Sequence, residues 1–434
     1  MELDKKIMQY GDDYYNGDNT NIMERTKKIY TSDYGIVDDP FLSNHKVTSG
    51  FFKQIVDQKV NYLLGNGIQW VTDDEQEQNI DDYFEWNFEQ ILTDLATTAS
   101  KKIVAWLYMY KDNGSLKFVE INPEQLEPIY NDKNELVEMR RRYKAGEQEI
   151  LLVYDRQGYT KSIKKADEWA VIYQGGHYFD TKEFNGRRIE QVPLGFGVVP
   201  FIPLWNNKEH RSDLQAIKRH IDLYDIIMSD FGNNVDDMQD AFFTIRGHTA
   251  TNSKELLEFV YNLKRSKIAS VPENGDLQTN QLKVPVEARK ELLSLLRKDI
   301  YSSAMAVNTD ELSGGSITNV VIKAMFADLD LKCDKFESQI AKFIYTLIEY
   351  INRFDNKNYS NQYNLDRSLI MNQKEISERL INEYSIGAMS MQTLRQLLPI
   401  ELNHEQEQEK LMQEDKDRII RLEGLAGGGD EQTD

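Results

Sequence analysis

The 434-residue sequence has a single cysteine, Cys333, and no apolar run that approaches the length of a membrane span. One cysteine excludes an internal disulfide and favours a reducing compartment. The first residues, MELDKKIMQYGDD, lack the basic and then apolar pattern of a secretory signal peptide. These absences predict a protein that assembles in the cytoplasm and does not enter a membrane.

The chain has too little positive charge to balance its acidic residues. It has 52 Lys and Arg against 72 Asp and Glu, which gives a formal net charge of −20. A protein this acidic does not hold DNA or an anionic membrane by general attraction. We therefore expect it to repel nucleic acid, or to contact it only locally.

Recognisable catalytic motifs are missing as well. The sequence has no GxxxxGK[ST] phosphate loop and no GxGxxG, HExxH or CxxC motif, and its six histidines are scattered. Neighbouring aspartates such as Asp236 and Asp237 could hold a divalent metal ion. Adjacent side chains on a helix point in different directions, so a solvated face is the favoured interpretation. The sequence predicts no enzyme, no metal and no cofactor.

Proline and tryptophan divide the chain into two halves. All five tryptophans lie in the first 205 residues, and no proline occurs between Pro203 and Pro272 or between Pro285 and Pro399. In the first half we predict helices over 51–64 and 80–100, then a hairpin around Asn113-Gly114 and several short strands. The prediction for this half is an α+β fold, with an antiparallel sheet packed on helices.

The second half is predicted to consist of long helices. Apolar residues of 212–240 alternate in gaps of three and four residues, and the same spacing recurs over 317–354. Ordinary core helices also show this spacing. Long helices that run out and back would form a thin stalk with little core of its own, however. We therefore predict that the stripe packs against neighbouring copies. The packing seam comprises Leu214, Ile217, Ile221, Tyr224, Met228, Phe231, Phe336, Ile340 and Phe343.

Five segments, in order along the chain, carry a family likeness: YYNGDNTNI (14–22), NHKVTSGFFKQIVDQKVNYLLGNGIQW (44–70), INPEQLEPIYND (121–132), residues 199–247 and SGGSITNVVIKAMFADLDLKCDKFE (313–337). Together they resemble portal proteins of tailed bacteriophages, in the siphophage branch from Gram-positive hosts. No segment is a catalytic motif, so the resemblance is carried by their sum. It covers residues 1 to about 400.

The resemblance implies a portal fold with a mixed α/β wing, a long-helix stem, a small α/β clip and a helical crown, assembled as a ring that usually has twelve subunits. Carried over by position, the wing is 1–211 and the stem helices are 212–240 and 286–304. The clip is 241–285, the tunnel loop 305–316, the long helix and wing return 317–373, and the crown with a disordered tail 374–434.

The resemblance also implies a location and partners. The ring would sit at the portal vertex of the virion capsid, after assembly in the host cytoplasm, and double-stranded DNA would be packaged and ejected through its tunnel. The implied partners are the terminase large subunit, a head-tail adaptor protein, and the scaffolding and major capsid proteins. ATP hydrolysis would belong to the terminase, which agrees with the missing phosphate loop.

Two sets of residues are candidates for facing the DNA. The tunnel-loop candidates are Asn308, Thr309, Asp310, Glu311, Ser313, Gly314, Gly315 and Ser316. The candidates for an acidic stem lining, which would repel phosphate, are Asp222, Asp225, Asp230, Asp236, Asp237 and Asp240. An ordinary helix connector is the alternative for the loop. A non-conducting oligomeric adaptor or scaffold, or a metal-dependent nuclease using paired aspartates, is the alternative for the whole protein.

Overall fold

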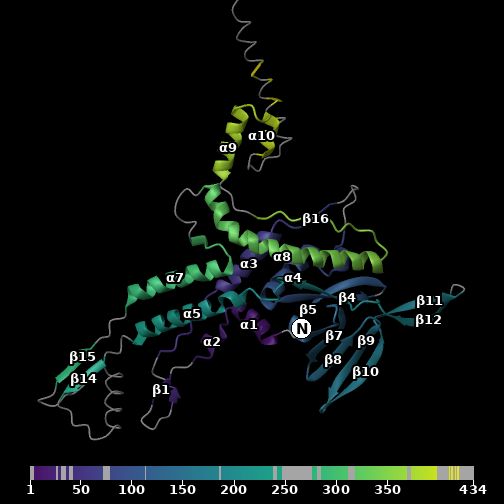
Figure 1. Ribbon diagram of the computed structural model, residues 1–434, viewed down its shortest axis with the longest axis horizontal. Helices are drawn as coiled ribbons and strands as arrows, with labels where there is room; N and C mark the ends of the chain where they lie inside the picture. The colour runs from purple at the N-terminus through teal and green to yellow at the C-terminus, as the bar shows by residue number, and fades with distance from the viewer. Residues whose placement is uncertain are drawn as a thin grey trace, which may run out of the picture. The chain divides into compact units, whose positions relative to one another are not determined.

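The computed structural model describes residues 4–25, 28–30, 36–38, 43–71, 79–112, 114–184, 187–237, 242–246, 276–280, 285–310, 318–368, 373–397 and isolated positions between 410 and 419 (Figure 1). The chain divides into two compact units. The first comprises Met1–Asn308 and Asp328–Ser368, and the second comprises Thr309–Ala327 and Leu369–Asp434. The mixture of helices and antiparallel sheets confirms the α+β class.

Four helices open the first unit, α1 (Lys5–Asn16), α2 (Thr20–Met23), α3 (Phe51–Leu64) and α4 (Phe88–Lys102). The predicted helix over 80–100 is wrong at its beginning, where Asp81–Tyr83 form only a 3-10 turn. Helix α4 begins later because the Asn87 side chain accepts a hydrogen bond from the Gln90 amide at 2.7 Å.

Two antiparallel sheets follow. In the first, β4 (Val104–Asp112) lies between β13 (Phe201–Trp205) and β5 (Ser115–Ile121). The predicted hairpin is confirmed, since Asp112 pairs with Ser115 and Gly114 has a φ of +85°.

The second sheet is a five-stranded meander that follows the 3-10 turn η2 (Pro123–Gln125). Its strands are β6 (Leu126–Tyr130), β7 (Leu136–Ala145), β8 (Gln148–Tyr154), β9 (Gly158–Lys165) and β10 (Glu168–Gly176). The two sheets share a core around Trp106, Met139 and Tyr154. A separate hairpin, β11 (Tyr178–Phe184) with β12 (Arg187–Leu194), comes next in the chain.

Three short strand pairs complete the sheets. They are β1 (Lys28–Tyr30) with β2 (Ile36–Asp38), β3 (Gln69–Trp70) with β16 (Tyr363–Asn364), and β14 (Phe242–Arg246) with β15 (Asp276–Asn280). The last pair places two strands within 241–285, the segment expected to form a small α/β clip. Residues 247–275 of that segment lie outside the described residues.

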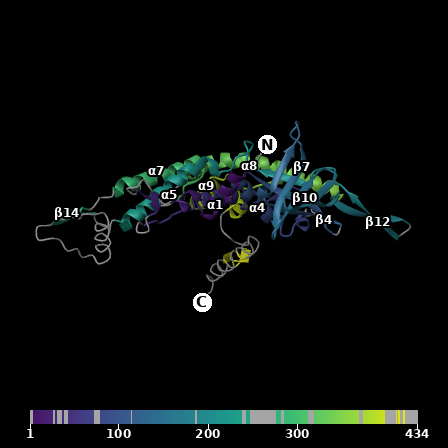
Figure 2. The same ribbon diagram turned by 90° about the horizontal axis from the view of Figure 1, so that it is seen from below.

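The second half of the chain is helical, as predicted. Its helices are α5 (Leu214–Asp237), α7 (Val286–Ala304), α8 (Asn319–Phe354), α9 (Gln373–Ser385) and α10 (Met391–Leu397). Helices α5 and α7 lie side by side in both views (Figures 1 and 2). The 36 residues of α8 correspond to about 54 Å of helix. The tail predicted to be disordered lies outside the described residues.

Candidate functional site

The apolar stripe of α5 is buried mainly inside the chain. Leu214, Ile217 and Ile221 are at most 2% exposed, and Phe336, Ile340 and Phe343 of α8 are at most 1% exposed. Tyr224, Met228 and Phe231 are half-buried. The prediction that this stripe packs between copies is therefore wrong for its fully buried members, which form core within one subunit.

Helices α3 and α7 cover the apolar stripe of α5, which was predicted to be covered by neighbouring copies. Phe51 of α3 packs edge-on against Tyr224 at 4.9 Å between ring centroids, and against Tyr301 of α7 at 5.9 Å. Helix α7 buries its own stripe, including Leu296 and Ile300. Helices α5 and α7 run antiparallel and pack on α3, and together the three helices form a core that α5 alone could not make.

The polar face of α5 binds an N-terminal segment of the same chain. Asp225, Ser229 and Asn233, spaced four residues apart, accept hydrogen bonds from the backbone amides of Ser49 (3.0 Å), Val47 (3.0 Å) and His45 (2.6 Å). We call residues 43–49 the strap. Two residues of extended chain advance about 6.6 Å and four residues of helix about 6.0 Å, so the two repeats match.

This arrangement corrects part of the predicted acidic lining. Asp225 is fully buried and also accepts a hydrogen bond from the Asn19 side chain at 2.8 Å, so its prediction as a channel-facing residue is wrong. Its burial raises the pKa of its carboxyl group. The other described candidates have partners in the N-terminal segment: Asp222 with Asn21, Asp230 with Arg25, and Asp236 with His45. Nothing is described of the Asp237 side chain, and Asp240 lies outside the described residues.

We expect Asp225→Ala to release the strap and to lower the free energy of unfolding by about 3 kcal/mol, because Asn19 and the Ser49 amide lose a buried charged acceptor. Denaturant unfolding and proteolysis at residues 43–49 would measure both effects. Asp230→Ala is the matched control, since it removes a part-exposed ion pair with Arg25 and should cost less than about 1 kcal/mol. Equal effects of the two changes would contradict the buried role of Asp225.

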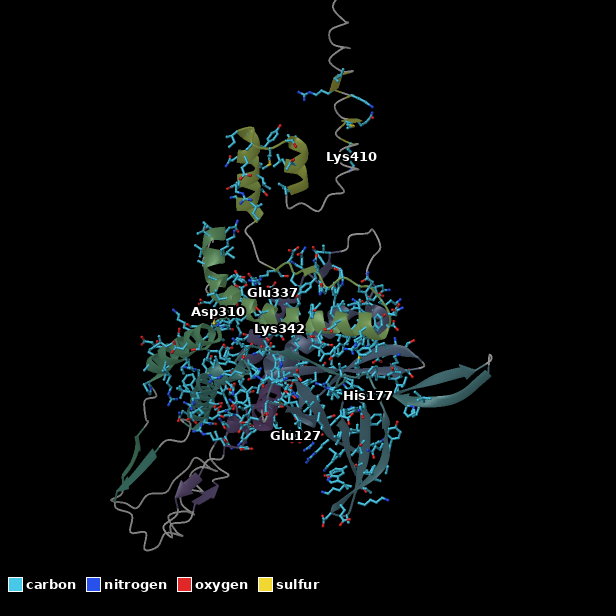
Figure 3. All side chains as sticks on the ribbon, turned by 45° about the vertical axis from the view of Figure 1, so that its right-hand side comes forward. Glu127, His177, Asp310, Glu337, Lys342 and Lys410 are labelled. Atoms are coloured by element: carbon cyan, nitrogen blue, oxygen red, sulfur yellow. The ribbon has the colours of Figure 1, made fainter. Side chains whose placement is uncertain are left out.

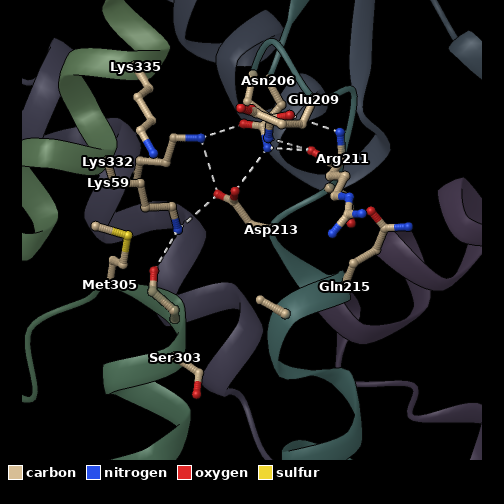
Figure 4. Close-up of a pocket in the computed structure, with 14 residues that line it drawn as sticks. Lys59, Asn206, Glu209, Arg211, Asp213, Gln215, Ser303, Met305, Lys332 and Lys335 are labelled. Atoms are coloured by element: carbon tan, nitrogen blue, oxygen red, sulfur yellow. Dashed lines mark hydrogen bonds and ion pairs between the residues drawn. The ribbon is translucent and has the colours of Figure 1, made fainter.

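A buried ionic cluster lies where α3, α5, α7 and α8 meet (Figure 4). The ammonium groups of Lys59 and Lys332 both lie 3.1 Å from Oδ2 of Asp213, and the Asn206 amide donates to Oδ1 at 2.9 Å. Burial lowers the pKa of the Lys59 ammonium to about 8, and the two lysines hold the pKa of Asp213 well below its usual range. We call Lys59, Asp213 and Lys332 the junction cluster.

The same region holds the end of α7, where the predicted tunnel loop begins. Lys332 donates a hydrogen bond to the Ala304 carbonyl at 3.0 Å, and Met305 adopts a φ of +53°. The Gln58 side chain of α3 then pairs with both backbone groups of Val307, donating to its carbonyl at 3.1 Å and accepting from its amide at 2.9 Å. The first residues of the predicted loop are therefore attached to α3.

We expect Gln58→Leu to speed hydrogen exchange at residues 305–308 and to lower the free energy of unfolding by about 1–3 kcal/mol, because both Val307 groups lose their partner. Exchange measured by mass spectrometry, together with denaturant unfolding, would check this. Gln58→Glu keeps the acceptor for the Val307 amide but loses the donor. Its exchange rate and its free energy of unfolding should therefore lie between those of the wild type and of Gln58→Leu. Unchanged exchange in both variants would contradict the attachment.

Only three tunnel-loop candidates lie within the described residues. Asn308 is half-buried and ends the first compact unit, whereas Thr309 and Asp310 are exposed and begin the second. Asp310 is labelled in Figure 3. Glu311, Ser313, Gly314, Gly315 and Ser316 lie outside the described residues. The structure therefore leaves the DNA-facing role of the loop as a prediction.

The junction cluster and the strap are absent from the sequence predictions, although each left a signal. Lys59 interrupts the apolar face of the helix FFKQIVDQKVNYLL, which is where a buried cation would stand. Asp225, Ser229 and Asn233 follow the four-residue spacing of one helix face. A solvated polar face has the same spacing, so the pattern alone could not identify the strap.

Sequence comparison now decides the family. The profile of the family described as "Phage portal protein, SPP1 Gp6-like" matches residues 1–421. The chain belongs to this family. Among its relatives, the portal protein of Clostridium phage phiCD119 is 25% identical over 433 residues, covering 95% of this chain and 93% of that protein. The portal protein of Bacillus phage SPP1 is also 25% identical, covering 93% of this chain and 83% of that protein.

Family membership confirms the resemblance found in the sequence. This portal protein is a structural component of the capsid vertex and not an enzyme, as predicted. The described helices include none that is long and apolar enough to cross a bilayer. Among the described residues, no group of three or more His, Cys, Asp or Glu side chains is placed to hold a metal ion.

Proposed function

We propose that copies of this portal protein close into a ring of twelve, whose central tunnel conducts double-stranded DNA during packaging and ejection. In this proposal residues 1–211 and 317–373 form the wing, and 212–240 and 286–304 the stem. Residues 241–285 form the clip, 305–316 the tunnel loop and 374–434 the crown. Family membership supports this layout, and the α5–α7 pair agrees with a two-helix stem.

The observation that carries the proposal is a second apolar stripe on α7. Leu292 is 43% exposed and Leu295 is 55% exposed, although the opposite face of α7 is already packed. On α5, Leu223 is 44% exposed. Large apolar side chains on adjacent turns of a paired helix favour a further protein contact. In a closed ring the α5–α7 pair of the next copy supplies that contact.

Acidic charge suits passage of DNA without retention. Twelve copies at −20 each would carry about −240, screened over roughly 8 Å at physiological salt. Burial removes only Asp225 from the candidate lining, so Asp222, Asp230, Asp236, Asp237 and Asp240 remain its candidates. The proposed partners are the terminase large subunit and head-tail adaptor at the clip, and scaffolding and major capsid proteins during assembly in the host cytoplasm.

Electron microscopy and native mass spectrometry of the purified protein would test the ring. We expect closed rings with a central hole, and monomers at every concentration would contradict the proposal. Packaging assays with residues 308–316 altered would test conduction separately. Normal packaging by intact rings with a scrambled loop would assign the loop the role of a plain connector.

A further inference from the structure

The junction cluster adjoins a cavity that is lined by more cationic than acidic side chains. The cavity has a volume of about 270 Å³, and four cationic side chains line it against two acidic ones. They are Lys59, Arg211, Lys332 and Lys335 against Glu209 and Asp213 (Figure 4). An excess of positive charge gathered in one cavity is unusual in a chain whose net charge is −20.

The imbalance is most severe at its buried end. Lys59 and Lys332 share a single carboxylate oxygen, and their side chains are only 1% and 13% exposed. Buried charges are costly unless they are matched by opposite charge. Arg211 and Lys335 form no ion pair with any residue of the described chain, so neither is occupied by an internal acid.

Two further features favour an anion over a cation or a neutral ligand. The cavity lies at the N-terminus of α5, where the helix dipole presents its positive end. The negative end of α7 also lines the cavity, but Lys332 already donates a hydrogen bond to its Ala304 carbonyl. Ser212, which precedes that N-terminus and lines the cavity, is 4% exposed, and its hydroxyl has no hydrogen-bond partner among the described residues.

We propose that this cavity binds a tetrahedral oxyanion of the phosphate or sulfate type, held by Arg211, Lys335 and Ser212 and compensating the junction cluster. The volume accommodates such an ion with a few waters. Each charged contact is of the strong, charge-assisted kind. The source is either a free oxyanion or a phosphodiester group of nucleic acid, since both present the same oxygens.

Sulfate is the probe of choice because it remains a dianion from pH 6 to pH 10. At constant ionic strength in chloride, sulfate should raise the melting temperature of the wild-type chain and give a saturable calorimetric titration. Arg211→Ala and Lys335→Ala should each weaken binding about tenfold. Lys342→Ala, which removes an exposed lysine farther along the same helix (Figure 3), should leave binding unchanged.

A pH series separates a built site from general surface attraction. Lys59 faces Ser100 of α4, Asn206, Asp213 immediately before α5, and Lys332, Cys333 and Phe336 of α8. Of these neighbours, Cys333 has its pKa raised to about 11 by burial and stays neutral, so Lys59 is the group expected to lose a proton near pH 8. Sulfate affinity should therefore fall between pH 7 and pH 9.5.

The proposal is overturned if sulfate acts no differently from chloride, if Arg211→Ala and Lys335→Ala bind like wild type, or if affinity is constant across that pH range. Competition by a short DNA duplex identifies the source. Displacement of sulfate by the duplex in wild type assigns a phosphodiester, and failure to displace it assigns a free oxyanion. Neither result depends on whether rings form, so the test is independent of the proposed function.

Discussion

Replacing Asp213 with alanine is expected to lower the free energy of unfolding by about 3–5 kcal/mol, which is the usual cost of removing one partner from a buried ion pair. The side chain is 8% exposed and lies 3.1 Å from both Lys59 and Lys332. Its loss leaves two largely buried cations without their carboxylate, and it leaves the Asn206 amide with only the Arg211 carbonyl as acceptor. Denaturant unfolding at pH 7 and a fixed protein concentration would measure the change.

Two matched variants separate charge from shape. Asp213→Asn keeps the volume and one oxygen acceptor but removes the charge, so its cost should lie between wild type and alanine. Asp328→Ala changes an exposed aspartate of α8 and should stay within about 0.5 kcal/mol of wild type. If Asp213→Ala were as stable as wild type, the cluster would contribute nothing to folding.

Changing both Leu292 and Leu295 to glutamate is expected to give folded chains that do not close into rings. Both side chains are exposed in the single subunit, so the substitution removes no internal core. At a subunit interface each leucine contributes about 1.5–3 kcal/mol, so losing two should weaken association by more than about a hundredfold. Native mass spectrometry would report the oligomer, and circular dichroism the fold.

Trp86→Glu is the control for that experiment. Trp86 is 69% exposed and precedes α4, away from the α5–α7 pair, so an equally large polar change there should leave rings intact. Rings formed normally by the Leu292 and Leu295 double variant would remove the main support for the proposed interface. Loss of rings in both variants would indicate a nonspecific effect of added charge.

Local sequence rules predicted most of the secondary structure because the signals were short-range. Gly114 with its positive φ marked the β4–β5 hairpin, and alternation marked the strands of the five-stranded sheet. The helix expected over 286–304 is observed as α7, with Pro285 immediately before its first residue. The missed beginning of α4 follows from a side-chain cap at Asn87, which outweighs the apolar pattern before it.

The candidate site was harder to predict because its residues meet only through tertiary contacts. The sequence showed an acidic face on α5 but not the strap that binds it, since residues 43–49 and 225–233 are far apart in the chain. It showed Lys59 in an apolar face but not Asp213 or Lys332 beside it. It also assigned the α5 stripe to neighbouring copies, because the cover from α3 and α7 depends on how the helices fold together.

By itself, the sequence determined the helices and strands, the acidic charge and the membership in a phage portal family. These depend on local periodicity, composition and ordered sequence likeness. Only the tertiary structure decided which stripe is core, which aspartates are buried and where cations gather without matching acids. Burial and ionic pairing depend on distances between residues remote in sequence, and no local pattern contains those distances.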